Sequence, residues 1–235
     1  MRSGARQEIA PEATNDGQTV REVFFVSSHR RLSRRERRQQ TTERLLSAGS
    51  QLFARNGFGG VSVEAIAAAA GYSRGAFYSN FATKEELFIE LLRRDRCMTQ
   101  AKLDTADAAC APLPDFDLRM RHLCGHLWRD RESLLNWTEA RVRAARDPDF
   151  RAKFRALLLD RGSAMADLIA ASSQDLNVEP AVPAITMAAG LMTVCEAIGL
   201  FALSNPVDLT PGDAERLLSA FMACVMQPAR PRSPQ

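Results

Sequence analysis

Residues 61–84 read VSVEAIAAAAGYSRGAFYSNFATK, and this stretch decides the fold. Ser62 is a typical N-cap residue, and the apolar residues that follow at helical spacing predict a helix over about residues 63–70. Gly71 ends this helix, because glycine enters a left-handed C-terminal turn without steric cost. Ser73 is placed to cap a second, short helix. Two short helices joined by a tight glycine turn indicate a helix-turn-helix, whose second helix usually reads the major groove of DNA.

The second helix has two predicted faces. Arg74, Tyr78 and Asn80 are expected to point outward, and Phe77 and Phe81 into the core. Arg74 can pair with a guanine edge or a phosphate, while the other two polar residues can reach the DNA backbone or base edges. The alternative is an ordinary surface helix with arbitrary polar side chains.

An amphipathic helix is predicted upstream, from Thr41 to Asn56. Gly49 lies inside it at a cost of about 1 kcal/mol relative to alanine, so a close helix crossing is expected there. Six arginines occupy the ten residues from His29 to Arg38. We interpret them as a basic arm that reaches a minor groove or phosphates, with Arg34 and Arg35 as contact residues. A solvated, mobile charge run is the alternative.

The sequence from Arg44 to Leu92 resembles the DNA-binding domain of TetR-family transcriptional regulators. The resemblance rests on Leu45, Leu46, Leu52, Phe53, Gly57, Phe58, Ser62, Val63, Ile66, Ala67, Ala70, Gly71, residues 73–78, Phe81, residues 83–86 and Leu87. It implies phosphate contacts from Ser62, Tyr72, Ser73, Tyr78 and Lys84. It also implies that Arg74, Gly75, Ala76 and Asn80 lie nearest the bases. Ala76 stands where the family often has threonine, and Asn80 where it often has histidine, so the resemblance implies the mode of DNA binding but not the operator sequence.

The rest of the chain predicts an all-α protein. Thr83 and Glu86 form a predicted capping box, and no alternating strand pattern appears. Helices are expected over residues 84–111, 115–130, 133–146, 149–172, 183–203 and 211–226. The predicted organisation is a flexible basic tail (1–38), a helix-turn-helix domain (39–84), a ligand-binding and dimerisation domain (85–226) and a disordered tail (227–235).

Composition restricts the class of protein. The net charge is only +3, but thirteen basic and seven acidic residues lie between His29 and Arg96, which indicates a polyanion partner at one end. The five scattered cysteines suggest reduced thiols in a cytoplasmic protein, and no run of eighteen uninterrupted apolar residues predicts a membrane span. Residues 1–28 lack a signal-peptide pattern. The absence of common catalytic motifs argues against an enzyme, and no cofactor is predicted.

Several residues of the C-terminal part are candidates for an effector pocket. Trp128, Trp137, Phe154 and Met165 either line such a pocket or belong to the core. Glu139 and Arg141 are either polar anchors in the pocket or a surface pair. His122 and His126 have spacing that can bind a metal, but no carboxylate is placed to complete the site, so no metal site is predicted.

The segment Pro183–Leu203 is apolar on nearly every face and therefore needs burial on all sides. Packing against a second copy would provide it, and the resemblance implies a four-helix dimer interface formed by the last two helices. The residues predicted to form the interface are Leu191, Val194, Ile198, Leu217 and Phe221.

These observations predict a homodimeric repressor that binds a pseudo-palindromic double-stranded DNA operator and is released by a small-molecule effector. Two alternatives remain open. One is a ligand-independent, dimeric DNA-binding protein, and the other is a small-molecule-modifying enzyme with a vestigial helix-turn-helix.

Overall fold

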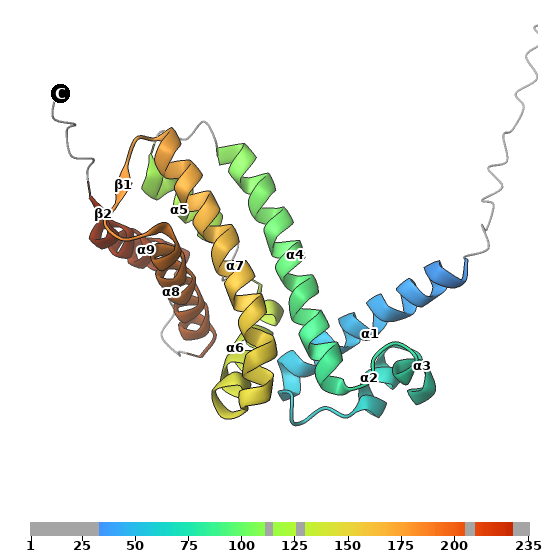
Figure 1. Cartoon of the computed structure of the whole chain (residues 1–235). Helices are drawn as coiled ribbons and strands as arrows, with labels where there is room; N and C mark the ends of the chain where they lie inside the picture. The colour runs from blue at the N-terminus through green and yellow to red at the C-terminus, as the bar shows by residue number, and fades with distance from the viewer. Residues whose placement is uncertain (1–32, 111–114, 126–129, 205–209, 228–235) are drawn as a thin grey trace, which may run out of the picture.

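The computed structural model describes residues 33–110, 115–125, 130–204 and 210–227. The described residues are almost entirely helical, as predicted (Figure 1). The helices are α1 (Arg34–Asn56), α2 (Val63–Ala69), α3 (Arg74–Tyr78), α4 (Lys84–Cys110), α5 (Phe116–Gly125), α6 (Arg131–Arg146), α7 (Pro148–Asp175), α8 (Ala184–Ser204) and α9 (Pro211–Val225). Two two-residue strands, β1 (Glu179–Pro180) and β2 (Met226–Gln227), pair antiparallel, which the sequence did not predict.

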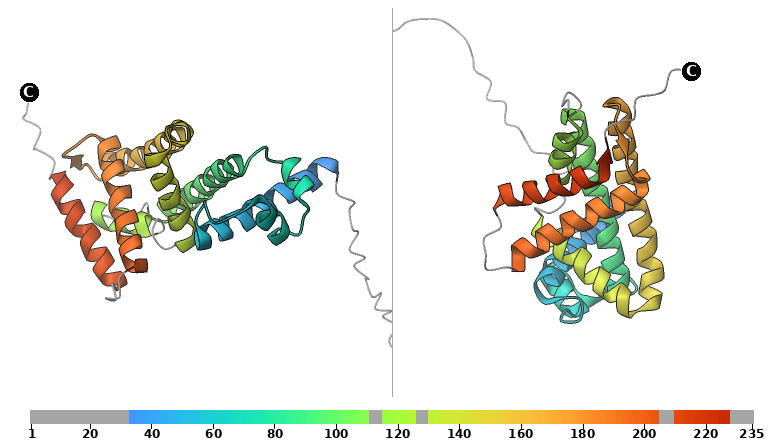
Figure 2. Two further views of the ribbon diagram at one scale, coloured as in Figure 1. Left: turned by 90° about the horizontal axis from the view of Figure 1, so that it is seen from below. Right: turned by 90° about the vertical axis from the view of Figure 1, so that its left-hand side faces the viewer.

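The helices α1–α3 lie at one end of the molecule, and α8 and α9 lie at the other (Figures 1 and 2). The long helix α4 starts beside α2 and runs away from it. Helix α7 packs along α4, and both run in the same direction. Helix α4 therefore connects the helix-turn-helix directly to the rest of the protein.

Two apolar clusters hold the chain together. The first joins α1–α3 and the start of α4 to buried residues of α6 and α7, among them Trp137, Phe150 and Phe154. The second joins α4, α5, α7, α8 and α9 around Met120, Met165 and Leu191. The first core crosses the division predicted at residue 84, because the small three-helix unit buries its apolar face against the body.

The helix end at Gly71 and the close helix crossing at Gly49 formed as the sequence predicted. Gly71 has φ +76°, and the N–H groups of Gly71 and Tyr72 donate to the carbonyls of Ala68 and Ala67. This pair of bonds is the Schellman pattern that ends a helix. The close crossing at Gly49 is also confirmed, because a Cβ added there would lie 2.7 Å from a methyl group of Leu87 on α4.

Helix α1 begins seven residues earlier than predicted. Ser33 caps it: its hydroxyl accepts from the Glu36 N–H (3.2 Å), and the Glu36 carboxylate accepts from the Ser33 N–H (2.6 Å). This capping box offsets the repulsion within the arginine run. The prediction that residues 34–38 belong to a flexible arm is therefore wrong. Ser33 is the first described residue. Residues 1–32 of the predicted N-terminal tail and residues 228–235 of the predicted C-terminal tail lie outside the described residues.

Helix α8 is long and apolar enough to cross a membrane by length and composition. One such helix is weak evidence, because an apolar helix in the core of a globular protein passes the same test. Its inner face, including Leu191 and Cys195, is fully buried within the second core.

Candidate nucleic-acid interface

Helix α3 displays two side chains suited to contact with DNA. The Ser73 hydroxyl caps this helix by accepting from the backbone N–H of Ala76 (3.3 Å). Arg74 and Tyr78 lie one turn apart and are both exposed. Phe77 between them is fully buried, so the predicted inward and outward faces are confirmed for these three residues.

An acidic neighbour on α2 holds Arg74. The Glu64 carboxylate lies 3.1 Å from the Arg74 guanidinium, and both side chains are exposed. The Arg74 guanidinium also lies 5.4 Å from the centre of the Tyr78 ring. The hydrogen bond to Tyr78 and the charge of Glu64 raise the pKa of Arg74. The guanidinium is thus oriented in the free protein, and a DNA base or phosphate must compete with Glu64 for it.

Asn80 does not point outward as predicted. Its amide nitrogen donates to the Ala76 carbonyl (2.8 Å) and to the Ser79 hydroxyl, while its oxygen accepts from the Thr42 hydroxyl (3.0 Å). Both polar atoms are therefore engaged, and the half-buried side chain links the end of α3 to α1. Its role in the structure is to position the reading helix, because a group with satisfied partners gains little from a base edge.

Lys84 also has partners inside the protein. Its ammonium donates to the carbonyls of Phe58 (2.7 Å) and Val61 (2.6 Å) and lies 4.3 Å from the centre of the Phe58 ring. Burial, together with the nearby charge of Arg143, lowers the pKa of Lys84. The structure therefore places Lys84 beneath the loop between α1 and α2, rather than free at the surface for a phosphate.

The other predicted contact residues surround α3. Ser62 caps α2 by accepting from the Ala65 N–H (3.1 Å), and its hydroxyl hydrogen can still donate, as can that of Ser73. Tyr72 is half-buried and packs against the first core. Gly75 is exposed, and Ala76 is half-buried.

The start of α1 carries four exposed arginines, Arg34, Arg35, Arg37 and Arg38. Arg38 lies one turn before Thr42, the residue that bonds Asn80 at the end of α3. A helix rises about 1.5 Å per residue, so Arg38 is about 6 Å and Arg34 about 12 Å farther along α1 from that contact. The basic turns of α1 therefore continue past the end of the reading helix.

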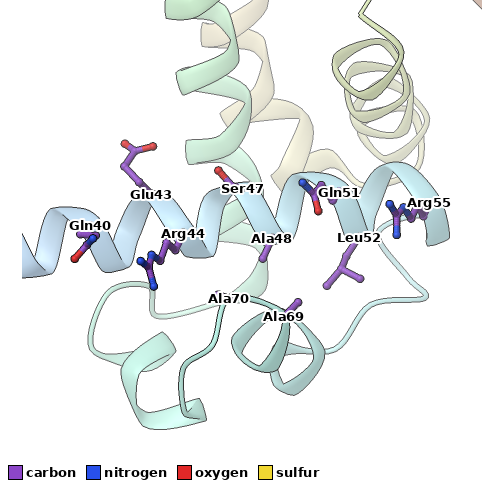
Figure 3. Close-up of a pocket in the computed structure, with 10 residues that line it drawn as sticks. All are labelled: Gln40, Glu43, Arg44, Ser47, Ala48, Gln51, Leu52, Arg55, Ala69 and Ala70. Carbon is purple, nitrogen blue, oxygen red and sulfur yellow. The ribbon is translucent and has the colours of Figure 1, made fainter. Parts of the chain in front are cut away.

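A groove of about 500 Å³ lies between α1 and the end of α2 (Figure 3). Ala48 and Leu52 of α1 face Ala69 of α2 across it, and Arg44 lies farther along α1, toward α3. The groove is open and belongs to the helix-turn-helix end of the molecule. The sequence did not predict it, because its two walls come from segments at least fourteen positions apart.

The predicted effector-pocket residues divide between the two cores. Trp137 and Phe154 are buried in the first core with their ring centres 5.6 Å apart, and Met165 is buried in the second. Trp128 lies outside the described residues. The core interpretation therefore fits Trp137 best. Phe154 also lines an open groove of about 410 Å³ between α6 and α7, and Met165 lines a cavity of about 10 Å³ between α4, α7 and α8.

Glu139 and Arg141 do not pair with each other, and Arg141 lines the groove between α6 and α7. The Glu139 carboxylate accepts from the Phe58 N–H (3.1 Å), and thus joins α6 to the loop after α1. Arg141 pairs with Glu196 of α8 at 2.7 Å. His126 is not among the described residues, and the parts of the chain that are described contain no cluster of three or more potential metal ligands.

The predicted dimer residues differ in their exposure. Leu191 and Ile198 are buried by the chain's own helices, so their assignment to a surface for a second copy is wrong in this structure. Val194 and Phe221 are half-buried, and Leu217 is 51% exposed. Sequence reasoning missed the exposed apolar residues of α8, Ile185 and Phe201, because a helix that is apolar all round does not reveal which face is covered.

Comparisons with known proteins agree with this geometry. The family model "Bacterial regulatory proteins, tetR family" matches residues 45–91, from the middle of α1 to α4. An HTH-type transcriptional regulator of Bacillus subtilis, YwcC, whose function is uncharacterized, is 41% identical over 58 residues. That match spans 25% of this chain and 26% of YwcC, so it covers about a quarter of the relative's length.

Two solved structures share the fold over most of their length. A putative TetR-family transcriptional regulator from a Rhodococcus species has a TM-score of 0.68 at 20% identity, covering 80% of this chain and 100% of that one. A putative transcriptional regulator from Saccharomonospora viridis, in complex with choline, has a TM-score of 0.65 at 19% identity, covering 80% and 99%.

The named relatives are transcriptional regulators or putative ones. The capped α2 and α3, the glycine turn between them and the family match over residues 45–91 lead to one conclusion. Residues 45–91 form a helix-turn-helix similar to that of the bacterial TetR-family regulators, and the chain shares the fold of the two solved structures.

Proposed function

We propose that the protein is a ligand-responsive repressor of the bacterial cytoplasm that binds a pseudo-palindromic operator as a homodimer. The observation that carries this proposal is the display of Arg74 and Tyr78 on the Ser73-capped α3, beside the exposed arginines of α1. Arg74 reads a base edge in the major groove, and Tyr78 and the α1 arginines contact phosphates. We keep residues 39–84 as the core of the DNA-binding part and 85–226 as the body.

The far end of the molecule supports a dimer. Large apolar side chains stand exposed on α8 and α9, with Ile185, Phe201 and Leu217 each about half exposed in the single chain. Such exposure marks interaction sites in soluble proteins. A two-fold pairing through α8 and α9 leaves both copies of α3 free. The reading helices of such a dimer are expected about 34–36 Å apart, one turn of DNA.

Contacts between the body and the DNA-binding end provide a route for regulation. Glu139 bonds the Phe58 N–H, and the Arg143 guanidinium lies 4.2 Å from the centre of the Phe58 ring. Arg143 and Lys153 both pair with Glu85 in the first turn of α4, and they lower its pKa. An effector that shifts α6 or α7 therefore moves the residues against which the helix-turn-helix packs. The choline complex of the S. viridis relative supports a small-molecule site in this fold.

A ligand-independent DNA-binding protein is the second candidate. The observation that favours it is the small size of the cavity between α4, α7 and α8, about 10 Å³, which has room for about one water molecule. The two candidates differ in whether any small molecule changes affinity for the operator.

The test of DNA binding is nuclease protection on the DNA that flanks the protein's own gene. We expect one protected, approximately two-fold symmetric site that random competitor DNA does not abolish. Specific affinity for such a site is typically 10³-fold or more above that for random DNA. Equal affinity for flanking and random DNA of the same length would contradict the proposal.

A further inference from the structure

The cavity between α4, α7 and α8 has a polar end and an apolar end. Its lining residues are Arg96, Thr99, Gln100, Leu103, Arg161, Met165 and Met192. Because α4 and α7 run in the same direction, Arg96 and Arg161 both lie toward the DNA-binding end. Leu103 is about 10 Å and Met165 about 6 Å farther along their helices, at a rise of about 1.5 Å per residue. Two guanidinium groups thus precede an apolar segment.

Positive charge exceeds negative charge at the polar end. The Glu196 carboxylate is shared by two arginines, Arg161 at 2.9 Å and Arg141 at 2.7 Å. Arg96 forms no ion pair with any described residue, and its guanidinium bonds the Cys97 sulfur at 3.7 Å. The nearby Asp95 carboxylate accepts from the Trp137 indole (2.5 Å) and the Ser133 hydroxyl (2.7 Å).

The environment of Arg161 is unfavourable for its charge. Only 12% of the side chain is exposed, and burial lowers its pKa even though Glu196 and Asp95 oppose that shift. Removing a cation from water is strongly unfavourable unless nearby anions compensate its charge. Here three guanidinium groups lie near two carboxylates, one of which is already engaged by an indole and a hydroxyl. One further anion at this position would balance the charge.

We propose that this cavity is the polar end of the effector site and that the effector is a carboxylate on an apolar body. The carboxylate lies between Arg96 and Arg161, and the hydrocarbon extends along Leu103, Met165 and Met192. This inference rests on the proposed ligand-responsive function. The cavity must widen on binding, and flexible thioether side chains allow such repacking.

The same residues connect the site to the DNA-binding end. The Arg161 guanidinium lies 4.5 Å from the centre of the Trp137 ring, which contacts Phe154. Phe154, Phe150 and Phe88 follow with ring centres 5.9 and 6.1 Å apart, and Phe88 packs in the core of the helix-turn-helix. A carboxylate that draws Arg161 away from Trp137 therefore changes the packing of the first core, which holds α1–α3 against the body.

Three compounds of equal chain length test the charge requirement: decanoate, its methyl ester and decyltrimethylammonium, each below its micelle concentration. Binding to the full-length protein is measured by calorimetry without DNA, and by Trp137 emission in a Trp128→Phe background, where Trp137 is the sole tryptophan. We expect decanoate to bind at least about tenfold more tightly than the ester, as a charge-assisted hydrogen bond provides. Equal binding of the ester or the cation, or no binding of decanoate, would overturn the proposal.

Matched variants test the position. Arg96→Met and Arg161→Met should each weaken decanoate binding about tenfold or more while leaving ester binding unchanged. Arg155→Met is the control, because Arg155 is an exposed arginine on α7 that lines a separate, shallow groove. Thermal unfolding identifies a variant that fails to fold, and Arg96→Met is the milder of the two because its guanidinium has no carboxylate partner among the described residues. An equal loss in Arg155→Met would assign the acid to the groove.

Operator affinity separates this inference from the proposed function. Decanoate binding that leaves operator affinity unchanged would retain the site but remove its role as an effector site. Failure of the protein to bind DNA specifically would overturn the proposed function, and calorimetry would still report on the site.

Discussion

At the scale of single residues, the free protein already orients the side chain most suited to reading a base. Arg74 is fixed between the Glu64 carboxylate and the Tyr78 ring, on a helix too short to be stable without its Ser73 cap and the buried Phe77. Five residues cannot form a stable helix alone, so tertiary packing fixes the position of the guanidinium. This preorganisation limits the rotamer entropy that base recognition must overcome.

Substitutions at Arg74, Glu64 and Tyr78 are expected to have different signatures. Arg74→Ala should weaken operator binding by roughly tenfold or more and relax base preference at one position, because the guanine edge is left without its hydrogen-bond donor. Glu64→Gln should tighten binding to operator and random DNA alike, because it removes a negative charge near the phosphates. Tyr78→Phe should weaken both modestly. Binding titrations on operator and random DNA measure these effects, and equal weakening by Arg74→Ala on both would make Arg74 a phosphate contact only.

Residue roles that depend on local sequence were predictable, and those that depend on distant partners were not. Ser62, Gly71 and Ser73 act through bonds within a few positions, and the sequence indicated all three. Asn80 and Lys84 have the right spacing for the DNA-facing surface. Their partners, however, lie 38 positions away at Thr42, and 26 and 23 positions away in the loop after α1. No local pattern reveals such contacts.

At the scale of elements, α1 shows how a cap can extend a helix into a charged segment. The capping box between Ser33 and Glu36 has the S-x-x-E spacing that is visible in the sequence, but the six arginines favoured the interpretation as a flexible basic arm. Because residues 34–38 are helical, their arginines have fixed directions. Arg35 and Arg38 continue the face of α1 on which Thr42 bonds Asn80, so they are displayed beside the end of α3, whereas Arg37 lies on another face.

The basic turns of α1 should contribute to the salt dependence of DNA binding. Replacing Arg34, Arg35, Arg37 and Arg38 with glutamine should flatten the plot of log affinity against log salt by about 0.9 for each phosphate that the protein no longer neutralises. Deleting residues 1–32 is the matched control, because it leaves Ser33 and its capping box intact. A large change in slope after the deletion, with none after the substitutions, would assign the phosphate contacts to residues before α1. Circular dichroism checks that α1 remains helical in the substituted protein.

At the scale of the whole molecule, the two ends have separate surfaces joined by α4 and by the first core. The helical fold and the approximate helix ends followed from periodicity and caps. The division of the apolar residues into two cores could not be predicted, because the sequence of α4, α6 and α7 does not indicate which cluster each apolar residue joins. The same ambiguity affected α8. Periodicity identified a helix with excess apolar surface, but only the structure separates the covered Leu191 from the exposed Phe201.

The exposed apolar side chains of α8 and α9 predict that these helices form the interface between two copies. Leu217→Glu should shift the protein toward a monomer, because the carboxylate would lie desolvated and unpaired against the second copy. Leu159→Glu is the control, because Leu159 of α7 is equally apolar and 57% exposed but lies on another helix. Neither substitution disturbs a side chain buried in the single chain, so both proteins should keep their thermal stability at low concentration. Sedimentation velocity over a range of concentrations measures the association.

Operator binding then tests whether the dimer is the DNA-binding form. A monomer presents one α3 to one half-site, so Leu217→Glu should protect the operator only at much higher concentration, without two-fold symmetry in the protected region. Binding to an isolated half-site should be nearly unchanged, because α3 and the α1 arginines are far from α9 (Figure 2). If Leu217→Glu remains a dimer with normal operator affinity while Leu159→Glu dissociates, the interface includes α7 rather than the exposed face of α9.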